Sequence, residues 1–348
     1  MKALRIYENA VVGVENIAEP IVTENSVKIK ISACGICGSD IPRVLNGKAH
    51  FYPIILGHEF SGIVVGLGEN VTNVVVGDHV TVAPLIPCKT CVDCKNGNYS
   101  LCKNYSFIGS RLNGAMAEYI VVPKENVIKL PKSINLYDAA LIEPLTVVLH
   151  AFKQNRHKSN KKVAILGMGT IGILAVQVAK YYGVENITAV VRNHKYDNLL
   201  NQIGVDNIIN TSENDWKNKV NIITDNRGYD MVYETAGSTV TIQQCFEIAA
   251  NKAQICFIGT PKNDISFTVQ TWEMINRKEL YLTGSWMSYS REFPGDEWDK
   301  AVKLLDKQKV IIYPDMINQK VKLQDSSHIF DDYKNGGTVS GRKLIIMG

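Results

Sequence analysis

The chain has 348 residues, of which 45% are hydrophobic and 21% charged, and its formal net charge is +4. Its length exceeds that of most single hydrophobic cores and predicts two domains, while the small net charge argues against a nucleic-acid-binding protein. No apolar run reaches the roughly 18 residues of a membrane span and the N-terminus lacks a signal-peptide pattern, so we expect a cytoplasmic protein with no membrane or nucleic-acid partner.

The residues up to about 145 predict short β-strands separated by glycine-rich turns. Apolar and polar residues alternate from 27 to 31, as in a half-buried strand, and similar runs occupy 60–66, 77–82 and 117–122. Many short strands with glycine turns between them are typical of an all-β, barrel-like domain.

From about residue 160 the expected strands and helices alternate. We expect strands at 161–167, 186–191, 231–237 and 254–259, and helices at 170–182, 197–203 and 241–250. This alternation predicts an α/β fold class with a parallel, doubly wound sheet. A further helix is expected at 295–308 and a closing strand at 343–347.

The stretch 33–40, Ala-Cys-Gly-Ile-Cys-Gly-Ser-Asp, places two cysteines just after the strand expected at 27–31. On its own this turn fits a redox dithiol, half of a zinc knuckle, or one metal ligand beside a structural cysteine. In the cytoplasm its thiols are expected to stay reduced or to bind metal rather than to form disulfides.

A mixed set of ligand-type residues accompanies that turn. Cys37 supplies a thiolate and His58 an imidazole, and Glu59 and Glu143 supply one or two carboxylates. A catalytic zinc uses three protein ligands of mixed type and keeps one position open. An alcohol bound there loses its proton near neutral pH and can then release a hydride to a nicotinamide. Each residue alone also fits a structural role, so the hypothesis depends on their joint presence.

A loop at about 86–104 contains four cysteines in the spacing C-x2-C-x2-C-x7-C, at Cys88, Cys91, Cys94 and Cys102. Four thiolates so close together favour a closed, structural Zn2+ site. An iron–sulfur cluster is the alternative, although the spacing differs from the common ferredoxin patterns. The loop is therefore predicted to bind a second zinc ion that takes no part in catalysis.

Residues 167–172, Gly-Met-Gly-Thr-Ile-Gly, lie between an expected strand and an expected helix. In this context the cofactor-binding candidates are Gly167, Gly169, Thr170, Ile171 and Gly172, since a glycine turn and a helix N-terminus bind a dinucleotide pyrophosphate. About 20 residues further on, an acid would bind the ribose of NAD. Val191 and Arg192 stand there instead. We therefore favour NADP(H) over NAD(H), with NAD or non-selective use as the alternative.

One chain combines the glycine pattern and the four-cysteine loop with three short motifs. These are Cys-Gly-Ser-Asp at 37–40, Gly-His-Glu at 57–59 and Glu-Pro at 143–144. Together they resemble the zinc-dependent medium-chain alcohol and polyol dehydrogenases over essentially the whole chain. Within that family the chain is most similar to the polyol-phosphate branch, through the stretches 39–43, 49–53, 107–111 and 284–287.

This resemblance implies a GroES-like catalytic domain of residues 1–145 and 285–348 and an inserted Rossmann domain of residues 146–284, with the active site in the cleft between them. It also implies two zinc ions per subunit, one catalytic and one structural, and a homodimer or homotetramer.

The same resemblance assigns roles to individual residues. Cys37, His58 and Glu143 match the catalytic zinc ligands, Glu59 matches a neighbouring acid that coordinates zinc directly or through water, and Ser39 matches the hydroxyl that relays the substrate proton. Pro42 replaces a histidine that many relatives place on the proton path. We therefore expect that path to use Ser39, water and the cofactor ribose.

We expect the substrate to be a polyol phosphate such as galactitol 1-phosphate, oxidised at a secondary hydroxyl to a ketose phosphate. Arg43 and Arg111 are the expected phosphate ligands, because a guanidinium can bind phosphate through two parallel hydrogen bonds. Pairing of each arginine with a surface carboxylate is the alternative. An unphosphorylated polyol, 2,3-butanediol or L-threonine remains open as substrate, and so does a non-catalytic zinc-binding relative.

Overall fold

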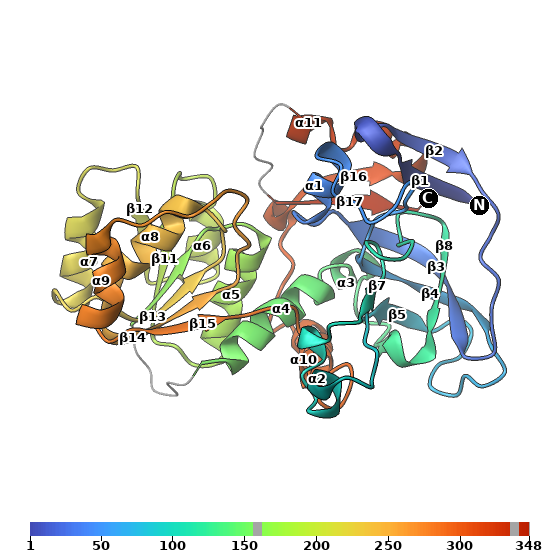
Figure 1. Cartoon of the computed structure of the whole chain (residues 1–348), viewed down its shortest axis with the longest axis horizontal. Helices are drawn as coiled ribbons and strands as arrows, with labels where there is room; N and C mark the ends of the chain where they lie inside the picture. The colour runs from blue at the N-terminus through green and yellow to red at the C-terminus, as the bar shows by residue number, and fades with distance from the viewer. Residues whose placement is uncertain (156–161, 335–340, 348) are drawn as a thin grey trace. The chain divides into compact units, whose positions relative to one another are not determined.

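The computed structural model describes residues 1–155, 162–334 and 341–347, so residue 161 of the strand expected at 161–167 lies outside the described part. The chain forms two compact units, Met1–Thr146 with Ser288–Gly348, and Val147–Met287. The blue and red ends of the chain belong to the same unit in Figure 1, and the second unit is formed by the middle of the sequence. No helix in the described residues is long and apolar enough to cross a bilayer.

The first unit is built on a seven-stranded sheet in the order β16-β17-β3-β4-β5-β9, with β8 also paired to β3. In β3, Val27, Ile29 and Ile31 are almost fully buried while the lysines between them are not, which explains the alternating sequence. The strands are β3 (Ser26–Gly35), β4 (Glu59–Leu67), β5 (His79–Val82), β8 (Tyr119–Pro123), β9 (Val127–Leu130), β16 (Ile317–Lys322) and β17 (Arg342–Ile346). A separate hairpin joins β1 (Lys2–Ile6) to β2 (Val12–Asn16).

The register of this sheet brings distant parts of the sequence together. Gly35 at the end of β3 pairs with Glu59 at the start of β4 and with Leu344 in β17. A Cβ atom on Gly35 would lie 2.6 Å from Oε2 of Glu59, so any other residue here would have to displace this carboxylate. The candidate metal ligands are consequently grouped where these three strands meet.

Several helices and two short strands lie outside the sheet in this unit. They are α1 (Asp40–Leu45), α2 (Val92–Lys95), α3 (Leu136–Ala139), α10 (Asp296–Asp306) and α11 (Asp331–Lys334), with the short strands β6 (Leu85–Ile86) and β7 (Ser106–Phe107). Helix α4 (Ile142–Lys153) was not predicted from the sequence. Most of its residues are buried, so it lacks the one-sided apolar pattern by which surface helices are recognised.

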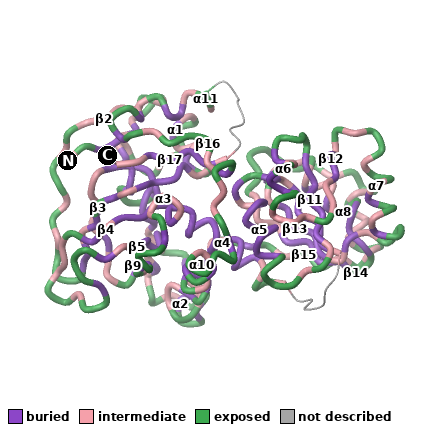
Figure 2. Tube along the Cα trace, turned by 180° about the vertical axis from the view of Figure 1, so that it is seen from behind, coloured by how far each residue is buried: buried purple, intermediate pink, exposed green. Residues whose placement is uncertain are grey.

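The second unit contains a six-stranded parallel sheet in the order β12-β11-β10-β13-β14-β15. Numbered from β10, this is the order 3-2-1-4-5-6 of a Rossmann sheet, which confirms the predicted fold class. Figure 2 shows buried backbone along β11 and β13. The strands are β10 (Lys162–Leu166), β11 (Asn186–Val191), β12 (Asn207–Asn210), β13 (Tyr229–Glu234), β14 (Ala249–Phe257) and β15 (Tyr281–Gly284).

Besides the part of α4 from Val147 onward, the described residues of the second unit form the helices α5 (Thr170–Tyr181), α6 (Asp197–Gln202), α7 (Trp216–Thr224), α8 (Thr239–Ile248) and α9 (Val269–Arg277). The sequence analysis missed α7 and α9 and the two edge strands β12 and β15. It also ended the helix before β14 at 250, whereas the strand already begins at Ala249.

Candidate active site and metal centres

Three of the predicted site residues come together in the first unit. Potential ligand atoms of Cys37, His58 and Glu59 all lie within 4.8 Å of one another. Cys37 follows β3, and His58 and Glu59 stand at the start of β4, so the pairing of these two strands creates the group.

Asp40 organises two members of this group, a role the sequence analysis did not predict. The backbone N–H of Cys37 donates to Oδ2 of Asp40 at 3.0 Å, and Nδ1 of His58 lies 3.6 Å from the other carboxylate oxygen. The imidazole also packs edge-on against Phe107, with ring centroids 5.5 Å apart. A carboxylate beside a ligand histidine fixes the orientation of its ring. The sequence feature that could have indicated this role is the position of Asp40 three residues after Cys37.

Arg342 is a second residue that the sequence analysis missed. Its Nε lies 3.0 Å from Oε2 of Glu59, and its Nη1 donates to the carbonyl oxygen of Ile36 at 2.8 Å. The Arg342 and Glu59 side chains are 10% and 1% exposed. Nothing local in the sequence indicated this contact, because it depends on the pairing of β17 with β3.

The electrostatics of the group favour a bound cation. Burial and, after it, the Glu59 carboxylate raise the pKa of Cys37 to about 11, against the lowering effect of Arg342. A divalent ion among these atoms stabilises the thiolate and opposes both effects. Nδ1 of His58 and Oε2 of Glu59 form no hydrogen bond with the described residues, although they lie 3.6 Å from Asp40 Oδ1 and 3.0 Å from Arg342 Nε. Thiolate, imidazole and carboxylate are the ligand types of catalytic zinc, so the residues fit this ion.

Glu143 lies beside this group and outside it. It stands in the first turn of α4, is 8% exposed, and is absent from the set of ligand atoms within 4.8 Å. Burial raises its pKa to about 8, with His58 lowering the value and Glu59 and Cys37 raising it. The structure therefore brings Glu59 into the group, where the sequence analysis had placed Glu143 first and Glu59 second.

The four loop cysteines form the second potential metal group. The thiol sulfurs of Cys88, Cys91, Cys94 and Cys102 lie within 4.8 Å of one another. Backbone amides point at two of these sulfurs, from Cys88 to Cys102 at 3.3 Å and from Cys91 to Cys88 at 3.4 Å. Four sulfurs with no open position fit a structural zinc ion. We call residues 88–102 the cysteine lobe.

The glycine turn of the second unit has the expected form. Gly167 follows β10 with φ of 91°, and α5 begins at Thr170. A Cβ atom on Gly172 would lie 1.9 Å from the carbonyl oxygen of Gly167, whereas a Cβ on Gly169 would meet nothing within 4 Å. Gly172 thus permits close packing of the helix on the strand. The free space at Gly169, just before the first helical turn with Thr170 and Ile171, is suited to a phosphate.

Arg192 follows Val191 at the end of β11, as expected, and is exposed. Its backbone carbonyl accepts a hydrogen bond from the hydroxyl of Ser212 at 2.8 Å, which holds the start of this loop. The guanidinium is therefore carried by a fixed backbone at the carboxyl end of the second strand.

The two candidate phosphate ligands lie in the first unit. Nη1 of Arg43 donates to the carbonyl oxygen and the hydroxyl oxygen of Ser39 at 2.7 and 3.1 Å. The Arg111 guanidinium lies 4.4 Å from the ring centroid of Tyr105. Burial lowers the pKa of the exposed His50, and the positive charges of Arg111 and Arg43 lower it further.

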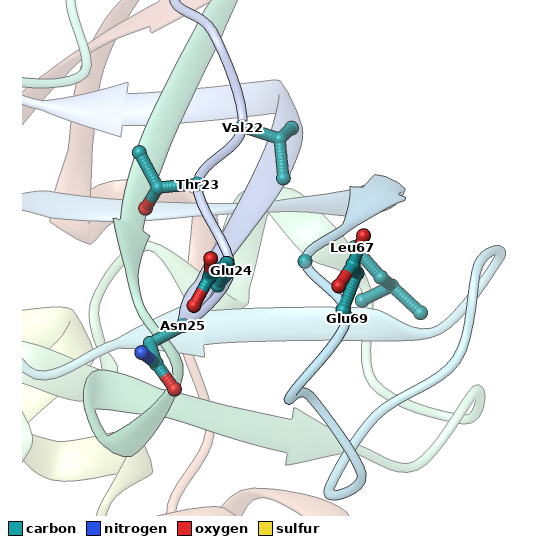
Figure 3. Close-up of a pocket in the computed structure, with 7 residues that line it drawn as sticks. Val22, Thr23, Glu24, Asn25, Leu67 and Glu69 are labelled. Carbon is teal, nitrogen blue, oxygen red and sulfur yellow. The ribbon is translucent and has the colours of Figure 1, made fainter.

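A groove of about 630 Å³ elsewhere in this unit contains none of the predicted residues. Figure 3 shows its lining side chains, which come from the segment before β3 and from the end of β4. They include two carboxylates, from Glu24 and Glu69, and no cysteine or histidine. The candidate active site is therefore the ligand group near Cys37 and not this groove.

We expect Arg342→Met to lower the free energy of unfolding by about 3 kcal/mol or more, because it leaves the Glu59 carboxylate buried without its cation. Urea unfolding at a fixed zinc concentration measures this change. Arg5→Met is the matched control, since its ion pair with Glu15 is partly exposed (28% and 37%) and should contribute less than about 1 kcal/mol. Equal losses in the two variants would contradict the expectation.

Comparison with known proteins agrees with this arrangement. Residues 23–132 match the model of the alcohol dehydrogenase GroES-like domain, and residues 170–307 match that of zinc-binding dehydrogenase. The chain is 42% identical to galactitol 1-phosphate 5-dehydrogenase of Escherichia coli K12 over 306 residues, which is 87% of this chain and 88% of that protein.

Two further relatives extend the comparison. A sorbitol dehydrogenase of Bacillus subtilis is 33% identical over 77% of this chain and 78% of its own. The crystal structure of galactitol-1-phosphate dehydrogenase from Escherichia coli superposes with a TM-score of 0.93 and 39% identity, over 99% of this chain and 100% of that one. The predicted resemblance is confirmed: the chain belongs to the zinc-binding dehydrogenase family, whose members are oxidoreductases of the zinc-type alcohol dehydrogenase class.

Proposed function

We propose that this protein is a zinc-dependent, NAD(P)-dependent polyol-phosphate dehydrogenase. The observation that carries the proposal is the ligand group of Cys37, His58 and Glu59, in a chain that also has Ser39 two residues after Cys37 and a dinucleotide-type glycine turn. Cys37 and His58 would hold the zinc ion together with a carboxylate from Glu59 or Glu143. Zinc at this position would supply a Lewis acid that lowers the pKa of a substrate hydroxyl.

The protein's own residues have distinct tasks in this reaction. Asp40 holds the turn of Cys37 through its backbone N–H and places a carboxylate oxygen 3.6 Å from the His58 ring. Ser39 takes the proton from the substrate hydroxyl. Because the Arg43 N–H donates to its oxygen, the serine keeps one lone pair to accept that proton while it passes its own proton to solvent. A dinucleotide held at the glycine turn of residues 167–172 would supply the nicotinamide that accepts a hydride from the substrate carbon.

We expect metal analysis to find two zinc ions per chain, and Cys37→Ser to bind one. That variant should lose at least about a thousandfold in turnover, because Lewis-acid assistance is worth several kcal/mol. Cys256→Ser is the control, since this buried thiol belongs to neither group and should leave metal content and turnover unchanged. A wild-type protein with one zinc ion and no dehydrogenase activity would instead support the non-catalytic alternative.

The phosphate on the substrate is the finer part of the proposal. It is supported by the similarity to galactitol 1-phosphate 5-dehydrogenase and by the guanidinium of Arg43, which is bonded to Ser39 two residues after Cys37. The similarity to a sorbitol dehydrogenase supports the alternative of an unphosphorylated polyol. Arg43 is the proposed main anchor because it is attached to the turn that carries Ser39.

We expect Arg43→Ala to raise the Michaelis constant for a polyol phosphate by about tenfold or more relative to that for the same polyol without phosphate, because a charge-assisted hydrogen bond contributes about 1.5–3 kcal/mol. Steady-state kinetics with both substrates gives this ratio, which also cancels any effect of the substitution on Ser39. Arg5→Ala should leave the ratio at its wild-type value. An equal effect of Arg43→Ala on both substrates would exclude the anchoring role.

NADP(H) is the proposed cofactor. The support is the guanidinium of Arg192 directly after β11 and the absence of a carboxylate at Val191, where an acid would bind the ribose of NAD. We expect Arg192→Ala to lower kcat/KM for NADP about tenfold while that for NAD changes little, since only the former loses a phosphate contact. A wild-type enzyme that prefers NAD would overturn this assignment.

We further propose a homo-oligomer, a dimer or a tetramer. Strand β15 ends the order of the second sheet, and Leu282 on it is 43% exposed. An edge strand with apolar side chains is suited to pairing with another copy. Analytical ultracentrifugation should therefore give two or four times the mass of the chain, and Leu282→Arg should lower it. Ile222→Arg, on an exposed position of α7, is the control.

A further inference from the structure

The segment that leads the chain back into the first unit is attached to the cysteine lobe. We call residues 288–294 the return segment. The backbone N–H of Tyr289 donates to the hydroxyl of Ser100 at 3.0 Å, and the Tyr289 phenol oxygen accepts from the N–H of Leu85 at 3.2 Å. Arg291 donates to the carbonyl oxygen of Lys95. The segment thus contacts the lobe at positions between its cysteines.

The same contact leaves little freedom for either partner. A Cβ atom on Gly97 would lie 2.8 Å from Cβ of Arg291, and the rings of Tyr99 and Phe293 meet edge-on with centroids 5.4 Å apart. Tyr289 is 2% exposed and stacks on Phe293. The lobe and the return segment are therefore packed as one body in which a shift of one displaces the other.

The first residue of the return segment is bonded to helix α4. The hydroxyl oxygens of Ser288 and Thr146 are 2.7 Å apart, and Thr146 also donates to the carbonyl oxygen of Glu143 at 2.7 Å. Thr146 has one hydroxyl proton, so Ser288 must be the donor to Thr146. Both residues are fully buried. The indole N–H of Trp298 donates to the Ser288 carbonyl at 3.2 Å and fixes its backbone.

The contacts of the return segment with the lobe and with Thr146 lead to the candidate metal ligands. Glu143, whose backbone is held by Thr146, carries a carboxyl that borders the group of Cys37, His58 and Glu59. Burial raises the pKa of the Tyr289 phenol, and the Glu143 carboxylate raises it further. The position of the first turn of α4 thus depends on a buried hydrogen bond from the segment that the lobe holds.

We propose that the cysteine lobe is a positioning element for the catalytic centre, acting through the return segment and the Ser288–Thr146 hydrogen bond to hold Glu143 beside the zinc ligands. This inference rests on the proposed function, in which Glu143 belongs to the catalytic site. In this proposal the lobe stabilises the geometry of the catalytic site as well as its own fold. Partners that orient metal-site residues contribute about ten- to a hundredfold to metal affinity, because misplaced ligands must be reordered on binding.

The experiment uses the full-length protein with Co2+ bound at the Cys37 site and zinc retained in the lobe. Ser100→Ala removes the bond from the lobe to Tyr289 and keeps all four cysteines, and Thr146→Val removes the bond to Ser288. We expect each to raise the dissociation constant of the Cys37-site ion about tenfold, measured by chelator competition, and to shift the visible absorption of bound Co2+. Thr146→Ser should restore both values.

Matched controls separate positioning from general loss of stability. Ser326→Ala removes a buried hydroxyl hydrogen bond of the same unit, to Leu323, and should leave the Co2+ spectrum and affinity unchanged. In all variants the lobe should keep its ion and the Michaelis constant for the dinucleotide should not change. Because both substitutions interrupt one path, the double variant Ser100→Ala/Thr146→Val should be little worse than the more affected single variant.

The possible outcomes are distinguishable. Folded Ser100→Ala protein with the wild-type Co2+ spectrum and affinity would overturn the positioning role, and so would multiplicative effects in the double variant. If Thr146→Val fails to fold, the comparison of Ser100→Ala with Ser326→Ala still decides the question. A wild-type protein that binds no ion at the Cys37 site would reject the proposed function itself, and the positioning role with it.

Discussion

The structure depends on the balance of charge among ionisable groups that are nearly removed from solvent. Cys37, His58 and Glu59 form one group with the buried Glu143 beside it, and Arg342 is the buried guanidinium paired with Glu59. Removing carboxylates from water costs several kcal/mol each unless a cation compensates for the loss. One guanidinium balances one carboxylate, so ionisation of the thiol and of a second carboxylate requires a further positive charge. A divalent ion is the ordinary means of supplying it.

The sheet of the first unit is what makes this concentration of charge possible. Adjacent strands lie about 4.8 Å apart, so residues paired across them are forced close together whatever their separation in sequence. Gly35 pairs with Glu59 on one side and with Leu344 on the other, which sets Arg342 near the turn that contains Cys37. The absence of a side chain at Gly35 then leaves room for the Glu59 carboxylate. Strand pairing, rather than any local motif, thus determines which charges meet.

The difference between local motifs and contacts made by strand pairing explains which parts of the structure could be predicted from the sequence. The glycine turn, the four cysteines and the Cys37 turn are local motifs, because their residues are close in sequence and act where the chain folds. Their positions and the α/β fold class followed from spacing and periodicity. The contact of Arg342 with Glu59 joins residues that are distant in sequence, and helix α4 lacks a polar face because it is buried. Edge strands such as β15 are short and partly exposed, so their apolar pattern was too weak to recognise.

The attachment of Arg43 to Ser39 bears on how substrate binding and proton transfer coexist in the proposed reaction. The contacts of this guanidinium with Ser39 and Asp40 are all made by Nη1. A guanidinium has five N–H donors, so its Nη2 and Nε can bind a phosphate through two parallel bonds without releasing the serine. A phosphate held in this way would also keep Arg43 in place. Binding of the substrate would then stabilise the orientation of the hydroxyl that accepts its proton, which an unphosphorylated polyol could not do.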